Sequence, residues 1–316
     1  MRIGLIDVDS HNFPNLALMK ISGYHKAKGD EVEWYMPFGD RYDIVYMSKV
    51  FSFTEDYDLV INADKVIRGG TGYAITLVDG VEIYDKAKDP ELPNEIEHYY
   101  PDYSIYPQYT NTAYGYITRG CPRGCGFCIV GKKEGKKTIP SSSLSEFWRG
   151  EKNIVLLDPN ILASPNRLSI LKELIASKVH IDFCQGLDVR MIDREVATLL
   201  GQIKMKEVHF AWDRMEDKDI ILPKLELFKI CVPRLFSGHH AVVYMIVNYN
   251  TTFEEDLERV TILRDMGYSP YVMIYDKEHC QRKYKDLQRW VNNRIIFSKC
   301  ATFKDYNNEK NKTKLT

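Results

Sequence analysis

The feature that most constrains the fold of this chain is a regular alternation of apolar, strand-like runs with helix-like runs after about residue 112. The predicted strands are 113–120, 153–158, 180–191, 207–213, 241–250 and 269–276, and the predicted helices are 143–150, 166–178, 193–204, 221–236, 252–267 and 281–297. The strands are apolar nearly throughout, as in parallel sheets covered on both faces. Six such units predict an α/β fold with a partial (β/α)6 barrel of the TIM type over residues 112–300.

The residues before this series have a different organisation. Predicted strands at 2–9, 31–36, 43–47 and 58–70 surround one predicted helix at 15–29. This alternation predicts a small Rossmann-like α/β domain over residues 1–84 with an open parallel sheet. Residues 85–111 are rich in proline and tyrosine, and are interpreted as a linker that packs across a surface; a stacking platform for bases or a ring substrate is the alternative. The polar residues 301–316 are predicted to form a disordered tail.

Composition excludes several classes of protein. With 43 Lys and Arg against 44 Asp and Glu, the formal charge is −1, so there is no strong signal for nucleic acid or an anionic membrane. No apolar run of membrane-spanning length is present, and the beginning MRIGLIDVDS does not resemble a secretory leader, so we expect a cytoplasmic protein. Seven cysteines, an odd number, argue against a disulfide framework.

Three of these cysteines are closely spaced in the run TRGCPRGCGFCIV, where Cys121, Cys125 and Cys128 have the pattern C-x3-C-x2-C. They directly follow the first strand of the predicted barrel, and active residues of such barrels lie at the carboxyl ends of strands. Neighbouring thiolates favour zinc, copper(I) or an iron–sulfur cluster. A structural zinc site needs a fourth ligand, such as Cys184 from another strand. A [4Fe–4S] cluster held by three cysteines would leave one iron open to a substrate or cofactor.

The cysteine loop, with Phe127 just before its last cysteine, resembles the radical S-adenosylmethionine superfamily. The stretch YGYITRGCPRGCGFC is similar to cobalamin-associated and methylthiotransferase-like members, with a degenerate N-terminal domain. The resemblance implies a [4Fe–4S] cluster on Cys121, Cys125 and Cys128, with S-adenosylmethionine on the open iron. It also implies an electron donor such as flavodoxin or ferredoxin, and a 5′-deoxyadenosyl radical that takes hydrogen from a substrate. The sequence does not identify that substrate, and it assigns no further catalytic residue.

The resemblance implies cofactor contacts at the ends of the later strands. Asp158 would bind the methionine amine, or would belong to the N-cap region of the next helix. Arg190 would bind the methionine carboxylate, or would pair across the barrel rim. Asp213 would lie near the ribose, although it is one carbon shorter than the glutamate of the family pattern. Asn248 would bind hydroxyl groups, or would serve as a turn residue.

Cobalamin is the least favoured of the implied cofactors. The family pattern of its domain matches Asp9-Ser10-His11, Ser48-Lys49-Val50 and Gly69-Gly70 in order, with His11 as the candidate cobalt ligand. Pro14 and Val50 replace the glycine and the leucine of that pattern. In the alternative interpretation, Lys49 and Phe51 fill the vacated cleft.

Three functions therefore remain open on the sequence. The main hypothesis is a radical S-adenosylmethionine enzyme of unassigned substrate. The second is a non-catalytic binding module in which zinc or a cluster staples the fold. The third is an RNA-modifying, methylthiotransferase-like enzyme, against which no cysteine precedes Cys121 to hold an auxiliary cluster and little chain follows the predicted barrel.

Overall fold

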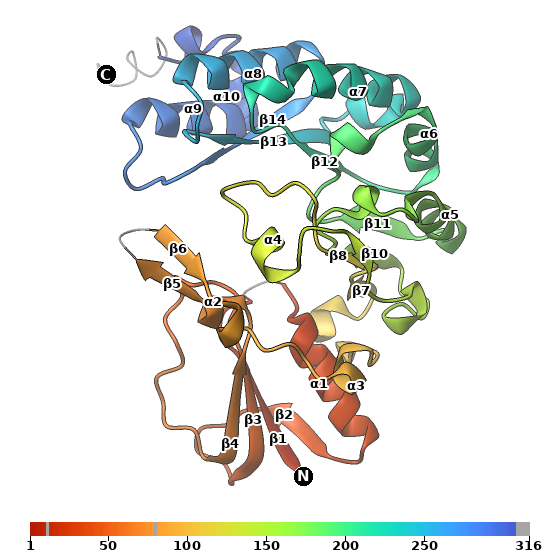
Figure 1. Ribbon diagram of the computed structural model, residues 1–316, viewed down its shortest axis with the longest axis vertical. Coiled ribbons are helices and arrows are strands. Elements are labelled where there is room, and N and C mark those ends of the chain that lie inside the picture. The colour runs from red at the N-terminus through yellow and green to blue at the C-terminus, as the bar shows by residue number, and fades with distance from the viewer. Residues whose placement is uncertain (11–12, 79–80, 308–316) are drawn as a thin grey trace. The chain divides into compact units, whose positions relative to one another are not determined.

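The computed structural model describes residues 1–10, 13–78 and 81–307. The chain divides into two compact units, Met1–Ile161 and Leu162–Thr316. Both units combine helices with parallel strands, which confirms the α/β class (Figure 1). The division falls inside the segment 112–300 that the sequence assigned to one barrel, so the barrel stays a prediction.

A four-stranded parallel sheet forms the N-terminal part of the first unit. Its strands are β1 (Arg2–Asp7), β2 (Glu31–Trp34), β3 (Tyr42–Ser48) and β4 (Ala63–Gly69), in the order β2-β1-β3-β4. Helix α1 (Leu16–Ala27) connects β1 to β2 and begins at Asn15, whose side chain accepts the N–H of Leu18. The parallel sheet predicted for this region is thus present.

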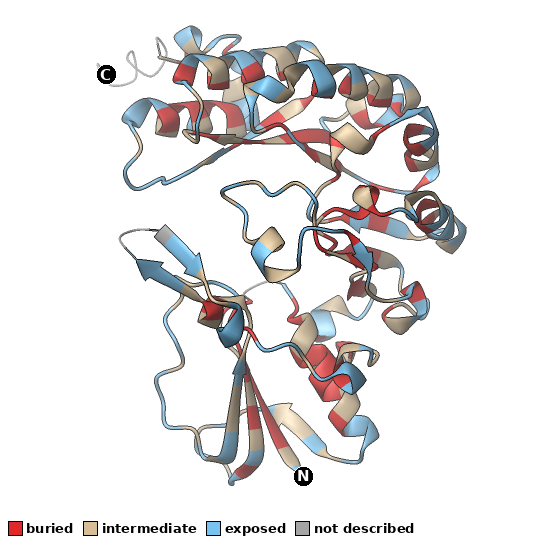
Figure 2. Cartoon of the chain, in the orientation of Figure 1, coloured by how far each residue is buried: buried red, intermediate tan, exposed pale blue. Residues whose placement is uncertain are grey.

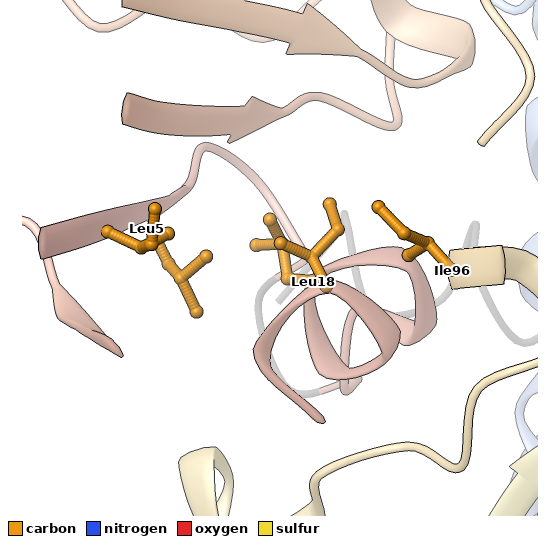
Figure 3. Close-up of a cluster of buried hydrophobic side chains, with 5 residues drawn as sticks. Leu5, Leu18 and Ile96 are labelled. Atoms are coloured by element: carbon orange, nitrogen blue, oxygen red, sulfur yellow. The ribbon is translucent and has the colours of Figure 1, made fainter. Parts of the chain in front are cut away.

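The core of this sheet includes part of the segment interpreted as a linker. Ile3 and Leu5 from β1 pack with Leu18 and Ile21 from α1 and with Ile96 from α3 (Asn94–Glu97). Figure 3 shows Leu5, Leu18 and Ile96 gathered from these three elements. All five side chains are buried, and burying one aliphatic side chain contributes roughly 1.5–3 kcal/mol. Residues 85–111 therefore pack against the sheet domain and add to its core.

The rest of the first unit consists of short elements. These are α2 (Thr71–Ala74), the antiparallel hairpin β5 (Ile75–Val78) and β6 (Val81–Tyr84), the parallel pair β7 (Thr112–Gly115) and β10 (Asn153–Leu156), the antiparallel pair β8 (Thr118–Arg119) and β9 (Ile139–Pro140), and α4 (Val130–Lys133).

The prediction of a helix at 143–150 is wrong, because only a 3₁₀ turn forms there, at Leu144–Glu146. Ser143 and Glu146 do make a capping box, the usual start of a helix. Phe147 then leaves the helical region with φ −132°. Its ring is buried so close to Gly115 that a Cβ on that glycine would lie 2.3 Å from it. Burial of this ring against β7 overrides the local helix signal.

The second unit contains a three-stranded parallel sheet, in the order β12-β13-β14. Its elements are α5 (Arg167–Ser177), β11 (His180–Phe183), α6 (Arg194–Gln202), β12 (Val208–Ala211), α7 (Lys218–Cys231), β13 (Ala241–Val247), α8 (Phe253–Asp265), β14 (Ser269–Ile274), α9 (Arg282–Asn292) and α10 (Arg294–Lys299). Helices α7, α8 and α9 lie along one face of the sheet (Figure 1). The central strand β13 is buried along most of its length (Figure 2).

The C-terminal segment up to residue 307 packs on this unit. Phe303 contacts the ring of Trp290 at a centroid distance of 5.7 Å, and Tyr306 is buried. A disordered tail was predicted over 301–316, but residues 301–307 pack on the second unit. Residues 308–316 lie outside the described residues. In the described part of the chain, no helix is long and apolar enough to span a bilayer.

Candidate functional site

The cysteine loop is closed at its base by two short strands. Thr118 and Arg119 of β8 pair antiparallel with Pro140 and Ile139 of β9. The single strand predicted over 113–120 is therefore divided into β7 and β8, and the three cysteines lie on a loop with fixed ends. This closure was not expected from the sequence.

Glycine at position 120 is required by both conformation and space. Gly120 has φ +82°, and a Cβ there would lie 2.2 Å from the carbonyl oxygen of Lys137. The carboxylate of Glu134 accepts the N–H of Gly120 at 3.1 Å and binds Arg119 at 3.2 Å. The N–H of Cys121 donates to the carbonyl oxygen of Gly135 at 3.2 Å. The backbone that leads into Cys121 is thus anchored to the returning arm of the loop.

None of the three cysteines of the loop is fully buried. Cys121 and Cys125 are half-buried and Cys128 is exposed, and the N–H of Cys128 donates to the carbonyl oxygen of Cys125 at 3.0 Å. No three His, Cys, Asp or Glu side chains of the described residues are grouped so that they could hold a metal ion. The donor chemistry nevertheless fits an iron–sulfur cluster, because the loop offers three thiols and each would bind a different iron.

Asp158 fixes the bend between β7 and β8. It is buried, and its carboxylate accepts the backbone N–H groups of Ile117 (3.2 Å) and Thr118, together with the Thr118 hydroxyl (2.7 Å). Burial raises the pKa of Asp158 to about 6, although the hydrogen bonds from Thr118 and Ile117 oppose this rise. Both carboxylate oxygens are engaged by the chain, and the contact with a methionine amine stays a prediction.

Replacing Asp158 with asparagine should change how stability depends on pH. Because the folded pKa is raised from 3.8 to about 6, the fold favours the protonated carboxyl. Its stabilising contribution is complete below about pH 4 and is lost as the pH rises through 6, a loss of roughly 3 kcal/mol. Asparagine cannot ionise and lacks this loss. Urea unfolding at pH 4, 5, 6 and 7 should show the wild type losing about 3 kcal/mol relative to Asp158→Asn, and parallel profiles would contradict the assignment.

A second residue after β10 reaches the cysteine loop. Asn160 is 3% exposed, and its amide Nδ2 donates to the Cys121 sulfur at 3.5 Å. The hydroxyl of Thr138 approaches the carbonyl oxygens of Gly120 (3.2 Å) and Asn160 (3.4 Å). The first unit thus brings Asn160 to Cys121, two residues after Asp158 in the sequence.

Sequence reasoning missed Asn160, Thr118, Thr138 and Glu134. For Asn160 a signal was available, because this polar side chain follows a predicted strand only two residues after Asp158. The roles of Thr138 and Glu134 depend on the return path of the loop, which no local pattern marks.

In the second unit, Arg190 is already paired with carboxylates. Its guanidinium binds Asp188 at 2.8 Å and Asp217 at 3.4 Å. These pairs resemble the rim pairing that was the alternative interpretation, and binding of a cofactor carboxylate stays a prediction.

Asp213 and Asn248 connect the ends of neighbouring strands. Asp213 accepts the N–H of Ile246 at 2.9 Å, and burial raises its pKa, against the effects of the Ile246 N–H and the charges of Arg259 and Arg190. Asn248 has a left-handed backbone (φ +63°) and donates its amide to the carbonyl oxygen of Tyr275 at 3.1 Å. Asn248 thus has the conformation of a turn residue, and neither cofactor contact is established.

A buried ion pair supports these strand ends. Arg259 and Asp256 of α8 are paired and both side chains are fully buried. Arg259 donates to the carbonyl oxygens of Trp212 and Ile246, and Asp256 accepts the N–H of Asn248 at 3.1 Å. The pair therefore positions the segments that carry Asp213 and Asn248. Cys184, the fourth zinc ligand of the alternative interpretation, also belongs to the second unit.

The region matched to a cobalamin pattern is partly filled by its own side chains. Lys49 is 8% exposed, and a Cβ on Gly72 would lie 2.7 Å from the Lys49 Cγ. Phe51 does not fill a cleft, because it is exposed and stacks on Phe53 at 5.3 Å. His11, the candidate cobalt ligand, lies outside the described residues.

Comparison with known proteins finds a distant, partial similarity. No family model matches the chain. A CDK5RAP1-like protein from Oryza sativa subsp. japonica is 25% identical over 248 aligned residues, with 61% of this chain and 41% of that protein covered. The chain spans about two fifths of the length of the curated relative that it matches.

Proposed function

We propose that this chain is a radical S-adenosylmethionine enzyme in which Cys121, Cys125 and Cys128 hold a [4Fe–4S] cluster. The observation that carries the proposal is the C-x3-C-x2-C loop, closed by β8 and β9 and anchored through Gly120. The partial similarity to a CDK5RAP1-like protein supports a distant relationship to the methylthiotransferase and radical S-adenosylmethionine family. The same relationship supports the proposal that this chain is an enzyme.

In this proposal, the chain supplies the cluster ligands and holds the loop that carries them. Three cysteines leave one iron of the cluster open, where the amine and carboxylate of S-adenosylmethionine would bind. When bound, the cluster would supply the electron for reductive cleavage of S-adenosylmethionine. Asp158 holds the backbone N–H of Thr118, and Glu134 holds the N–H of Gly120, so the start of the ligand loop keeps its shape. The substrate that loses hydrogen is not assigned.

We further propose a role for the second unit, a barrel fold and an electron-donating partner. Arg190, Asp213 and Asn248 would contact the cofactor from the strand ends of a partial (β/α)6 barrel. A cytoplasmic electron donor such as flavodoxin or ferredoxin would reduce the cluster. Methylthiotransferase-like RNA modification is the second candidate, and the similarity to a CDK5RAP1-like protein is the observation that favours it.

Anaerobic reconstitution with iron and sulfide tests this assignment. The desalted protein should hold about four irons and about four sulfides per chain. After reduction with dithionite, it should give a cluster electron paramagnetic resonance signal that shifts when S-adenosylmethionine is added. One zinc per chain without sulfide would contradict the proposal and favour a metal-stapled binding module.

A further inference from the structure

We propose that Asn160 is a positioning residue for Cys121, whose amide N–H donates to the cluster-ligand sulfur and raises the reduction potential of the cluster. This inference rests on the proposed function and concerns the same centre. Asn160 would bind neither iron nor the cofactor. The quantity that tests its role is the reduction potential of the cluster.

The contact joins two parts of the first unit that are far apart in the sequence. The distance from Asn160 Nδ2 to Cys121 Sγ is 3.5 Å across 39 residues. Asn160 is 3% exposed, so its amide is nearly inaccessible to bulk water. Buried polar groups are almost always hydrogen-bonded, because an unmade bond has a high cost in free energy. The contact between the amide and the sulfur therefore involves a donor that is shielded from bulk water.

The hydroxyl of Thr138 lies between the two backbone segments that carry the contact. The Thr138 hydroxyl lies 3.2 Å from the carbonyl oxygen of Gly120, the residue before Cys121, and 3.4 Å from the carbonyl oxygen of Asn160. Gly120 is also held by Glu134, whose carboxylate accepts its N–H at 3.1 Å. The backbone segments that carry Cys121 and Asn160 are thus held near each other.

The chemical effect follows from the charge on the sulfur. An N–H donor stabilises negative charge on a thiolate, and a reduced cluster places more negative charge on its sulfurs than an oxidised one. Hydrogen bonds to the sulfurs are among the factors that set the potentials of iron–sulfur clusters. The Asn160 amide should therefore stabilise the reduced state more than the oxidised state.

Asn160→Leu removes the donor while keeping a side chain of similar size. Redox titration of the reconstituted protein, followed by electron paramagnetic resonance, should show an equilibrium constant for one-electron reduction that is about tenfold lower, which is a potential lower by about 59 mV. Asn153→Leu is the matched control. Asn153 is the first residue of β10, and its amide donates to Asn111 and Thr112 and not to the cysteine loop. The control should keep the wild-type potential.

Asn160→Ser is a second variant in case the leucine disturbs folding, because it stays polar but is one bond shorter. Its potential should fall in the same direction. Wild-type potentials in both Asn160 variants at wild-type iron content, or an equal shift in Asn153→Leu, would overturn the role of Asn160 and leave the proposed function standing. A wild-type chain that assembles no cluster would instead overturn the proposed function, and this inference with it.

Discussion

Replacing Cys121, Cys125 and Cys128 together with alanine is expected to lower the bound iron from about four per chain to below about one. The three thiols are the soft ligands of the closed loop, and without them the loop offers no thiolate to iron. Iron and acid-labile sulfide should be measured on the desalted protein after anaerobic reconstitution. Circular dichroism should show that the fold is retained, because the ends of the loop are held by β8 and β9.

The control is a second triple variant in which Cys184, Cys231 and Cys280 become alanine. These cysteines are half-buried, belong to the second unit and lie outside the loop. This variant should keep about four irons per chain. Loss of metal from it would contradict a three-cysteine cluster and would favour a site that includes Cys184.

Replacing Arg259 with methionine is expected to lower the free energy of unfolding by about 3–5 kcal/mol. The change leaves the buried carboxylate of Asp256 without its guanidinium partner. It also removes the donor to the carbonyl oxygens of Trp212 and Ile246 at the ends of β12 and β13. Urea unfolding at pH 7 measures the effect.

Two further variants separate the ion pair from a general loss of charge. Arg214→Met removes an exposed guanidinium from Asp217, which keeps its pair with Arg190, and pairs at the surface contribute about 0–1 kcal/mol. Adding Asp256→Asn to Arg259→Met removes the unpaired buried charge, so the double variant should be more stable than Arg259→Met alone. An Arg259→Met variant as stable as Arg214→Met would contradict the supporting role of the pair.

The sequence predicted those parts of the fold that depend on local pattern. The apolar runs correctly indicated parallel strands, and the helix predicted at 15–29 is present as α1. The prediction was wrong where a distant contact overrides the local signal. Burial of Phe147 against Gly115 prevents the helix expected at 143–150, and Asp158 turns the chain between β7 and β8 from about 40 residues away.

The candidate site divides in the same way. The spacing of Cys121, Cys125 and Cys128 is visible in the sequence, because all the information lies within eight residues. The contact of Asn160 with Cys121 joins segments 39 residues apart and needs the folded chain. Asp158 was identified as a site residue, but the structure shows it binding the backbone of its own unit.

The most direct test of the central claim is the cleavage of S-adenosylmethionine. The reconstituted chain should be incubated anaerobically with dithionite and S-adenosylmethionine, and 5′-deoxyadenosine should be quantified by mass spectrometry. We expect the wild type to release 5′-deoxyadenosine and the Cys121, Cys125 and Cys128 triple variant to release none above background. A cluster-loaded wild type that releases no more than the triple variant would contradict the account.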